Sequence, residues 1–341
     1  MQFKDVIGQE AVKKKLILSV KENRVPHAQL FLGPAGNGKM ALALAYAQYI
    51  LCPNRTESDS CGVCPSCQKI SKLIHPDLHF VMPTATTKKV KSNPESDLFL
   101  EEWREYVQKE NGYIDTSTWY NFLDVENKQG VINVRDAAAL LRKLSFKAYE
   151  GAFKIAIIWM AEKVNEVAAN KLLKLLEEPP EKTVFILIAE SQDQLLATIK
   201  SRTSLVKVPQ IALDDLKNAL VMRKGCNEQQ AMDAAIVAEG NWLDASRFVE
   251  DQDDEKFFFT TFQQWMRLCF KAAVGELVDF SNNIKSVGRE KQKSLLQYGV
   301  KIVRNALLFN NNLADIVMLP ADEKTFGSKF APFINPANLA Q

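Results

Sequence analysis

Apolar residues in the first part of the chain follow two different periods. Continuous apolar runs, which are typical of strands buried in a parallel sheet, occur at QLFLG, AFKIAIIWM and TVFILIAE (29–33, 152–160 and 183–190). Helical periodicity occurs between them, at MALALAYAQYIL (40–51) and NEVAANKLLKLLEE (165–178). Strands that alternate with helices predict parallel βαβ units, so residues 1–208 are expected to form a three-layer α/β domain.

From about residue 211 the strand pattern ends, and only helical periodicity remains. Glycines interrupt it at four places, and we expect two helical units, at about 209–250 and 254–335. The runs FFFTTFQQWMRLCFKAAV and KSLLQYGVKIVRNALLFNNN are long enough for helices with a wide apolar face. Six aromatic residues of the second unit are expected in its core rather than on a stacking surface: Phe257, Phe258, Phe259, Phe262, Trp265 and Phe270.

Residues 83–130 form an insertion in the α/β pattern. Its first part, PTATTKKVKSNPES (83–96), is polar with two prolines and predicts a flexible loop. The next run, DLFLEEWREYVQKE, has the pattern of an amphipathic helix. Nothing in the sequence assigns a function to this insertion.

Charge and hydropathy limit the classes of function. The 43 Lys and Arg residues nearly balance the 41 Asp and Glu residues, so bulk electrostatics does not favour a protein that coats nucleic acid. Contact with DNA is therefore expected to be local or shared with partners. The longest apolar runs are far shorter than a membrane span, and the N-terminus lacks the pattern of a secretory signal. We expect a cytoplasmic protein whose thiols are reduced.

Four of the six cysteines lie close together, at Cys52, Cys61, Cys64 and Cys67. Two CxxC spacings in a polar loop with Gly62 favour a tetrahedral, structural Zn²⁺ site at residues 52–67. Free thiols or an iron–sulfur cluster remain alternatives. His75 and His79 follow the cluster, and for both a packed or solvated role is favoured over metal ligation. Cys226 and Cys269 stand alone and are expected to be buried.

A phosphate-binding loop follows the first predicted strand. Residues 33–40, GPAGNGKM, match G-x-x-x-x-G-K between a strand and a helix. Gly33, Gly36 and Gly38 allow the backbone N–H groups to surround phosphate oxygens, and Lys39 supplies an ammonium group. Met40 stands where the motif has Ser or Thr, and its thioether is a poor ligand for Mg²⁺. ATP or ADP binding is therefore doubtful, and Mg²⁺ binding is not expected.

The strand at 155–160 also lacks the acidic residues that hold Mg²⁺ in active P-loop ATPases. It ends in Trp159–Met160–Ala161–Glu162. Glu162 is a candidate substitute, although a surface position just beyond the strand is the favoured interpretation. Arg202 in Ser201–Arg202–Thr203 is, from sequence alone, best interpreted as an ordinary surface charge.

Five segments together resemble the clamp-loader branch of the AAA+ ATPases. They are VIGQE (6–10), HAQLFLGPAGNGK (27–39), the four cysteines, AANKLLKLLEEPPE (168–181) and LLATIKSRT (195–203). The resemblance covers about residues 1–250 well. It implies a RecA-like AAA+ domain with an inserted zinc module, then a helical lid (209–250) and an all-α collar (254–335) that joins five subunits.

The resemblance also implies partners and a role for Arg202. The expected partners are gamma/tau ATPase subunits and a delta subunit in a pentameric ring, with the sliding clamp and primed DNA. Family members place an arginine from a Ser-Arg-Cys motif into the neighbouring subunit's ATP site. Ser201 and Arg202 match this motif, with Thr203 in place of Cys, so Arg202 is expected to act in trans as an arginine finger.

The departures from the family pattern all affect the chain's own site. Alignment to the family places Trp159 and Met160 at the Walker B acids, Ala189 at the sensor 1 position and Leu243 at the sensor 2 arginine. We therefore expect a non-hydrolysing subunit without intrinsic ATPase activity, within a clamp-loader ATPase complex of the DNA polymerase holoenzyme. The alternatives are an active gamma/tau-like ATPase subunit that uses Glu162, and a stand-alone zinc-ribbon nucleic-acid binder.

Overall fold

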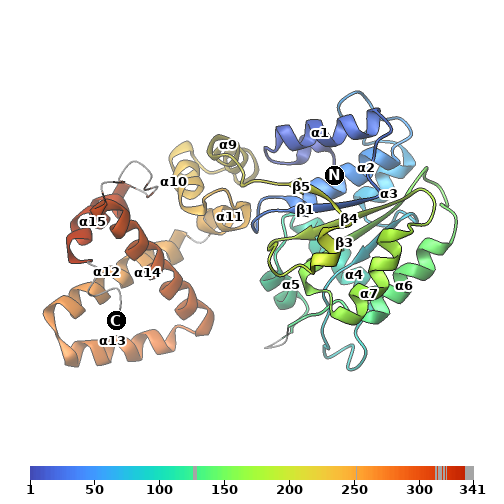
Figure 1. Cartoon of the computed structure of the whole chain (residues 1–341). Coiled ribbons are helices and arrows are strands. Elements are labelled where there is room, and N and C mark those ends of the chain that lie inside the picture. Colours follow the sequence, from blue (N-terminus) through green and yellow to red (C-terminus); the bar gives the residue numbers. More distant parts are fainter. Residues whose placement is uncertain are drawn as a thin grey trace. The chain divides into compact units, whose positions relative to one another are not determined.

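The computed structural model describes residues 1–125, 129–250, 252–311, 313, 317, 319 and 321–334 (Figure 1). Contacts within the chain divide it into two compact units. The first comprises Met1–Leu216 and Gly240–Leu243, and the second comprises Lys217–Glu239 and the residues from Asp244 onward. Each unit is described by itself. The finer division into a lid at 209–250 and a collar at 254–335 stays a prediction.

The first unit is built on a five-stranded parallel sheet with the strand order β2-β3-β4-β1-β5. The strands are β1 (Ala28–Leu32), β2 (Leu78–Val81), β3 (Lys154–Trp159), β4 (Thr183–Ala189) and β5 (Ser204–Lys207). Strands β3 and β4 are buried along their whole length, as expected for the centre of a sheet covered on both faces. The predicted runs at β1, β3 and β4 are confirmed, whereas β2 and β5 were not predicted.

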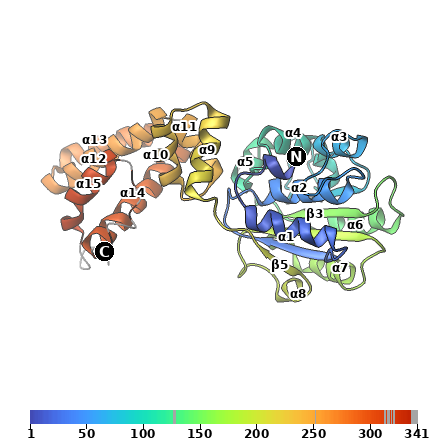
Figure 2. The same ribbon diagram turned by 90° about the horizontal axis from the view of Figure 1, so that it is seen from above.

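Helices cover both faces of this sheet (Figure 2). Those of the first unit are α1 (Glu10–Lys21), α2 (Lys39–Leu51), α3 (Pro65–Ser71), α4 (Leu100–Lys109), α5 (Thr116–Phe122), α6 (Val134–Ser145), α7 (Glu166–Glu177) and α8 (Ala197–Lys200). Short 3-10 helices lie at Phe3–Asp5, Ser96–Phe99 and Ala161–Lys163. The alternation of strand side chains between two covered layers confirms the predicted three-layer α/β fold.

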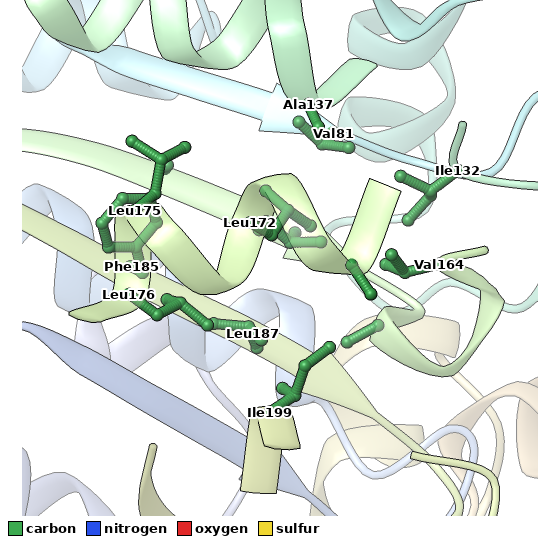
Figure 3. Close-up of a cluster of buried hydrophobic side chains, with 14 of the residues drawn as sticks. Val81, Ile132, Ala137, Val164, Leu172, Leu175, Leu176, Phe185, Leu187 and Ile199 are labelled. Atoms are coloured by element: carbon green, nitrogen blue, oxygen red, sulfur yellow. The ribbon is translucent and has the colours of Figure 1, made fainter. Parts of the chain in front are cut away.

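The face that carries α6 and α7 has a continuous core (Figure 3). Leu172 and Leu176 of α7 pack with Phe185 and Leu187 of β4. Ile199 of α8 joins the same cluster and is fully buried. This packing fixes the end of α7 and the turn after α8 relative to the sheet.

The insertion packs on the opposite face. Phe80 of β2 and Trp159 of β3 contact Trp103 of α4, with ring centroids 6.3 and 5.1 Å apart. Trp119 of α5 meets Trp103 edge to face at 5.2 Å. The predicted amphipathic helix is thus confirmed as α4, and it buries its aromatic side against the sheet.

The second unit is helical. Its helices, with those that cross the boundary, are α9 (Leu213–Lys224), α10 (Glu228–Ala238), α11 (Trp242–Glu250), α12 (Gln252–Lys271), α13 (Val274–Ser286), α14 (Arg289–Asn310) and α15 (Ala321–Phe330), followed by a 3-10 turn at Ala331–Phe333. Phe258 and Phe262 pack with Tyr298 and Ile302 in its core. Among the described residues no helix combines the length and the apolar character that crossing a membrane requires.

Two expectations for this region were wrong. Phe270 is 74% exposed and lies outside the predicted core. Cys226 is half-buried and Cys269 is exposed, so neither is the buried small residue that its isolation in the sequence suggested. Phe270 and Cys269 both lie in the last turn of α12, and the Phe270 ring contacts Phe333, which is itself half exposed.

Candidate functional site

The predicted phosphate-binding loop has the backbone shape of its motif. It connects the buried end of β1 to the first turn of α2. Gly36 and Gly38 have φ angles of 68° and 86°, in the left-handed region that glycine adopts at little cost. The loop thus brings Gly33, Gly36, Gly38 and Lys39 together, whereas their role in binding a nucleotide stays a prediction. The side chains around the loop, however, differ from those of a nucleotide-binding site.

Lys39 points back into the protein. Its Nζ donates to the carbonyl oxygen of Pro34 at 2.5 Å and to Oδ1 of Asn37 at 3.2 Å. The side chain is buried, and this burial lowers the pKa of Lys39 to about 8, although the carboxylates of Glu190 and Glu162 oppose the shift. The ammonium group that would hold a phosphate is thus already bound to the loop's own backbone and to Asn37.

The turn between α4 and α5, within the insertion, covers the loop from outside. Tyr113 is fully buried, and its hydroxyl accepts a hydrogen bond from the N–H of Ile7 at 2.8 Å. A Cβ on Gly38 would lie 2.9 Å from the Tyr113 ring, and one on Gly112 would lie 2.9 Å from the backbone of Ala41 in α2. The ring and backbone of this segment therefore touch the positions where a bound phosphate chain would enter.

Residues at the start of α11 close a second side. The N–H of Trp242 donates to the carbonyl oxygen of Gly36 at 3.0 Å, and the rings of Trp242 and Tyr113 lie 5.7 Å apart. The side chain of Asn241 lies so close to Gly36 that a Cβ there would overlap its Oδ1. Leu243, which is expected at the sensor 2 position, is buried and has no charge to offer a phosphate.

Among the described residues, a cavity of about 10 Å³ lies beside the loop and the start of α2. This is about the minimum that one water molecule needs. Trp159 and Ile188, at the ends of β3 and β4, line it together with Glu190. Trp159 brings an indole ring to this cavity, and Met160 and Ala189 are also buried. Their alignment with the Walker B acids and sensor 1 stays a prediction. Met40 is buried in α2.

The carboxylates of Glu162 and Glu190 lie close enough to Lys39 to act on its charge. Glu162 Oε1 accepts from the N–H of Glu190 at 2.7 Å, and its buried Oε2 has no hydrogen-bond partner among the described residues. Burial raises the pKa of Glu190. Glu162 is therefore a cap for the end of β4 and not the free surface residue that the sequence favoured.

The sequence did not identify Tyr113, Glu190 or Asn241 as part of this site. The run Glu110–Asn111–Gly112 did carry a turn signal, and Asn111 and Gly112 indeed have φ angles of 49° and 72°. The turn could be predicted, but its contact with a helix about 70 residues earlier could not.

Arg202 lies just after α8. Ile199 of α8 belongs to the core on the face of the sheet that α6 and α7 cover. The Nε of Arg202 donates to Glu177 Oε1 at 2.5 Å, and its Nη2 is also ion-paired with that oxygen. Nη1 donates to the carbonyl oxygen of Thr198 and to Ser201 Oγ, both at 3.1 Å. About a third of the Arg202 side chain is exposed. Ser201 thus contacts the predicted finger directly.

The four cysteines form the predicted cluster. Their sulfur atoms all lie within 4.8 Å of one another. The separations of Cys52 from Cys61 and Cys64 are 3.6 and 3.9 Å, and that of Cys61 from Cys67 is 3.9 Å. Tetrahedral zinc with bonds of about 2.3 Å puts its sulfur ligands about 3.8 Å apart, so the four residues fit a metal ion of this kind.

Backbone N–H groups support the sulfur atoms as they would support thiolates. Cys61 N, Cys64 N and Cys67 N donate to the sulfur of the preceding cluster cysteine at 3.4, 3.4 and 3.5 Å. The N–H groups of Val63 and Cys64 lower the pKa of the Cys61 thiol to about 6, whereas burial raises the pKa of Cys52. Among the described residues the ligand cluster contains only the cysteines, which leaves His75 and His79 outside it.

Comparison with known proteins identifies the family. The model of the family described as "DNA polymerase III, delta subunit" matches residues 8–212, which is more than half of the chain. The chain belongs to this family. The family match and the delta' relatives confirm the resemblance to the delta-prime subunit.

The curated relatives include delta' subunits and gamma/tau subunits of DNA polymerase III. The chain is 31% identical to the DNA polymerase III delta' subunits of Yersinia pestis over 189 residues and of Escherichia coli over 192 residues. These alignments cover 55% and 56% of this chain and 43% and 45% of the relatives. The gamma/tau subunit of Mycobacterium tuberculosis is 30% identical over 59% of this chain and 27% of its own length. The chain thus spans less than half the length of these relatives.

A solved structure with broad coverage is a DNA polymerase III gamma subunit-related protein from Thermotoga maritima. It matches 96% of this chain and 93% of its own, at 15% identity and a TM-score of 0.40. A score this low carries no argument. The fold class rests on the sheet order and on the P-loop position between β1 and α2.

Proposed function

We propose that the chain is a non-hydrolysing subunit of the bacterial clamp loader, which helps load the sliding clamp onto primed DNA. It would share a pentameric ring with gamma/tau ATPase subunits and a delta subunit, and supply Arg202 to a neighbour's ATP site. The second candidate is an active gamma/tau-like ATPase subunit, which the gamma/tau relatives favour.

The observation that carries the proposal is the filled P-loop. A cavity of about 10 Å³ is far too small for a triphosphate, and the segment Gly112–Tyr113 lies against the loop. Opening it would expose the buried Tyr113 ring and break the bond from Ile7 N–H. Nucleotide binding would have to compensate for both losses.

Electrostatics supports the same conclusion. A nucleotide would bring three or four negative charges next to the carboxylates of Glu162 and Glu190, which act on Lys39. Like charges at short range in a partly desolvated site repel strongly. Met40, Trp159 and Met160 offer no oxygen ligand for Mg²⁺, so among the described residues beside the loop only the carboxylates of Glu162 and Glu190 could hold an ion that offsets this repulsion.

Arg202 is suited to act outside its own chain. Its guanidinium is partly exposed, and its backbone is fixed by the buried Ile199 in the preceding turn. A planar, permanently charged fork matches phosphate oxygens. In other phosphate hydrolases such a finger stabilises charge on the transferred group and is worth about 10³–10⁵ in rate.

The test has two parts. The purified chain with Mg-ATP should show no turnover above background, while a loader reassembled with Arg202→Ala should hydrolyse ATP more slowly than wild type. Arg135→Ala is the matched control, because Arg135 is an exposed arginine of the same unit. Robust turnover by the isolated chain, abolished by Lys39→Met, would instead support the gamma/tau-like candidate.

We also propose that the four cysteines hold structural Zn²⁺. Four sulfur ligands leave no open coordination position, so the ion would stabilise the loop after α2 without taking part in chemistry. The metal would link Cys52, which caps α2, to Cys64 and Cys67 at α3. Elemental analysis should find one equivalent of zinc, and Cys64→Ser should lose it. A metal-free protein of unchanged thermal stability would contradict this.

A further inference from the structure

Arg202 does not lie loose on the surface. Three of its nitrogen atoms are bound, and the partner that takes two of them is Glu177. The other bonds, to Thr198 O and Ser201 Oγ, come from its own turn. Glu177 is therefore the distant group in sequence that orients the guanidinium.

Both residues are attached to well-packed backbone. Leu176, next to Glu177, and Ile199, three residues before Arg202, belong to one buried cluster (Figure 3). The core thus sets the separation of the two side chains, and their pairing needs no adjustment of the backbone. A partner subunit that approached this face would meet a guanidinium already held in place.

The carboxylate of Glu177 is unfavourable at its position in α7. Glu177 is the last residue of α7, where the negative end of the helix dipole disfavours a carboxylate and favours a cation. Arg202 supplies that cation. A residue that conflicts with its own helix but satisfies a distant side chain is expected where function selects it.

We propose that Glu177 is a positioning residue for Arg202, an inference that rests on the proposed arginine-finger function. It holds Nε and Nη2, while Nη1 is bound within its own turn, so one N–H of Nη2 remains to face an anionic phosphate of a neighbouring subunit. An exposed ion pair is weak, so the finger is ordered without being trapped. Removing Glu177 makes the side chain mobile, and the neighbour's site must then order it at each encounter.

The test compares Glu177→Ala and Glu177→Gln with Glu178→Gln, which removes a carboxylate from the next residue. In the isolated full-length chain, the side-chain Nε–H NMR signal of Arg202 should become mobile in Glu177→Ala and stay ordered in Glu178→Gln. In the reassembled loader, the single-turnover rate at the neighbouring site should fall roughly two- to tenfold for Glu177→Ala. The KM for ATP should not change, and Glu177→Gln should be intermediate.

Two results would overturn the inference in different ways. If Arg202→Ala slows the loader but Glu177→Ala does not, or if Glu177→Ala speeds it, Glu177 does not position the finger, while the proposed function stands. If Arg202→Ala itself has no effect, both the finger and its positioning residue fall together. Unchanged thermal stability of Glu177→Ala excludes misfolding as the cause of a loss.

Discussion

The P-loop and the segment around Arg202 lie in the same unit, but their side chains are arranged in opposite ways. Lys39 is buried and bound to its own loop, whereas Arg202 is partly exposed and held by a surface carboxylate. The P-loop is covered by Tyr113 and by the start of α11. The difference indicates that one motif has become part of the core, while the other remains partly exposed at the surface.

The largest expected effect is at the residue that closes the P-loop. Tyr113→Ala removes a fully buried ring, and losses of about 3–5 kcal/mol in unfolding free energy are typical of such aromatic truncations. Tyr113→Phe should cost about 1–3 kcal/mol, because the Ile7 N–H loses its acceptor. Denaturant unfolding measures both.

Tyr113→Ala also tests whether the P-loop has lost its ability to bind nucleotide or is only covered. Tyr113→Ala opens the cavity but leaves Glu162 and Glu190 in place, so it should still not bind a fluorescent ATP analogue. Tight binding of the analogue by Tyr113→Ala would mean that the ring alone excludes nucleotide. The P-loop would then be a closed site rather than a lost one.

Lys39 gives a pH-dependent effect of intermediate size. Burial lowers its pKa from 10.5 to about 8. Below pH 8 the lysine is charged in both the folded and unfolded chain, and the folded state bears the cost of a buried charge. Between pH 8 and 10.5 the unfolded state binds more protons, so stability rises with pH, by up to about 3 kcal/mol.

The measurement is the difference in unfolding free energy between wild type and Lys39→Met from pH 7 to 10.5. The wild type should gain relative to the variant over this range, because methionine does not titrate. A difference independent of pH would show that the Lys39 ammonium reaches solvent. That result would remove the contrast with Arg202.

The smallest effect is expected at the surface pair. Arg202→Ala should change the unfolding free energy of the isolated chain by no more than about 1 kcal/mol, since exposed ion pairs contribute little. Thermal unfolding beside Arg135→Ala measures this. A larger loss than the control would place Arg202 among the structural residues.

Much of the fold could be predicted because the central strands are continuous apolar runs. β5 was missed since only Val206 of its four residues is buried, which leaves no apolar run to detect. β2 is equally short. The cysteine cluster was predictable because its ligands are close in sequence and their spacing suits one ion.

The closure of the P-loop could not be predicted in the same way. It depends on Tyr113 meeting Ile7, residues separated by 106 positions, and local pattern carries no information about such a contact. The pairing of Arg202 with Glu177 across 25 positions was hidden for the same reason. Sequence did indicate that the site was altered, through Met40 and Trp159, but not what had replaced the nucleotide.

The most direct test compares a variant of the P-loop with a variant of the Arg202 motif in one assay. Single-turnover ATP hydrolysis is measured for loaders reassembled with Lys39→Met or with Arg202→Ala. The account predicts an unchanged time course for Lys39→Met and, for Arg202→Ala, loss of the contribution of one neighbouring site, slowed by about 10³ or more. A normal time course with Arg202→Ala and a reduced one with Lys39→Met would contradict it.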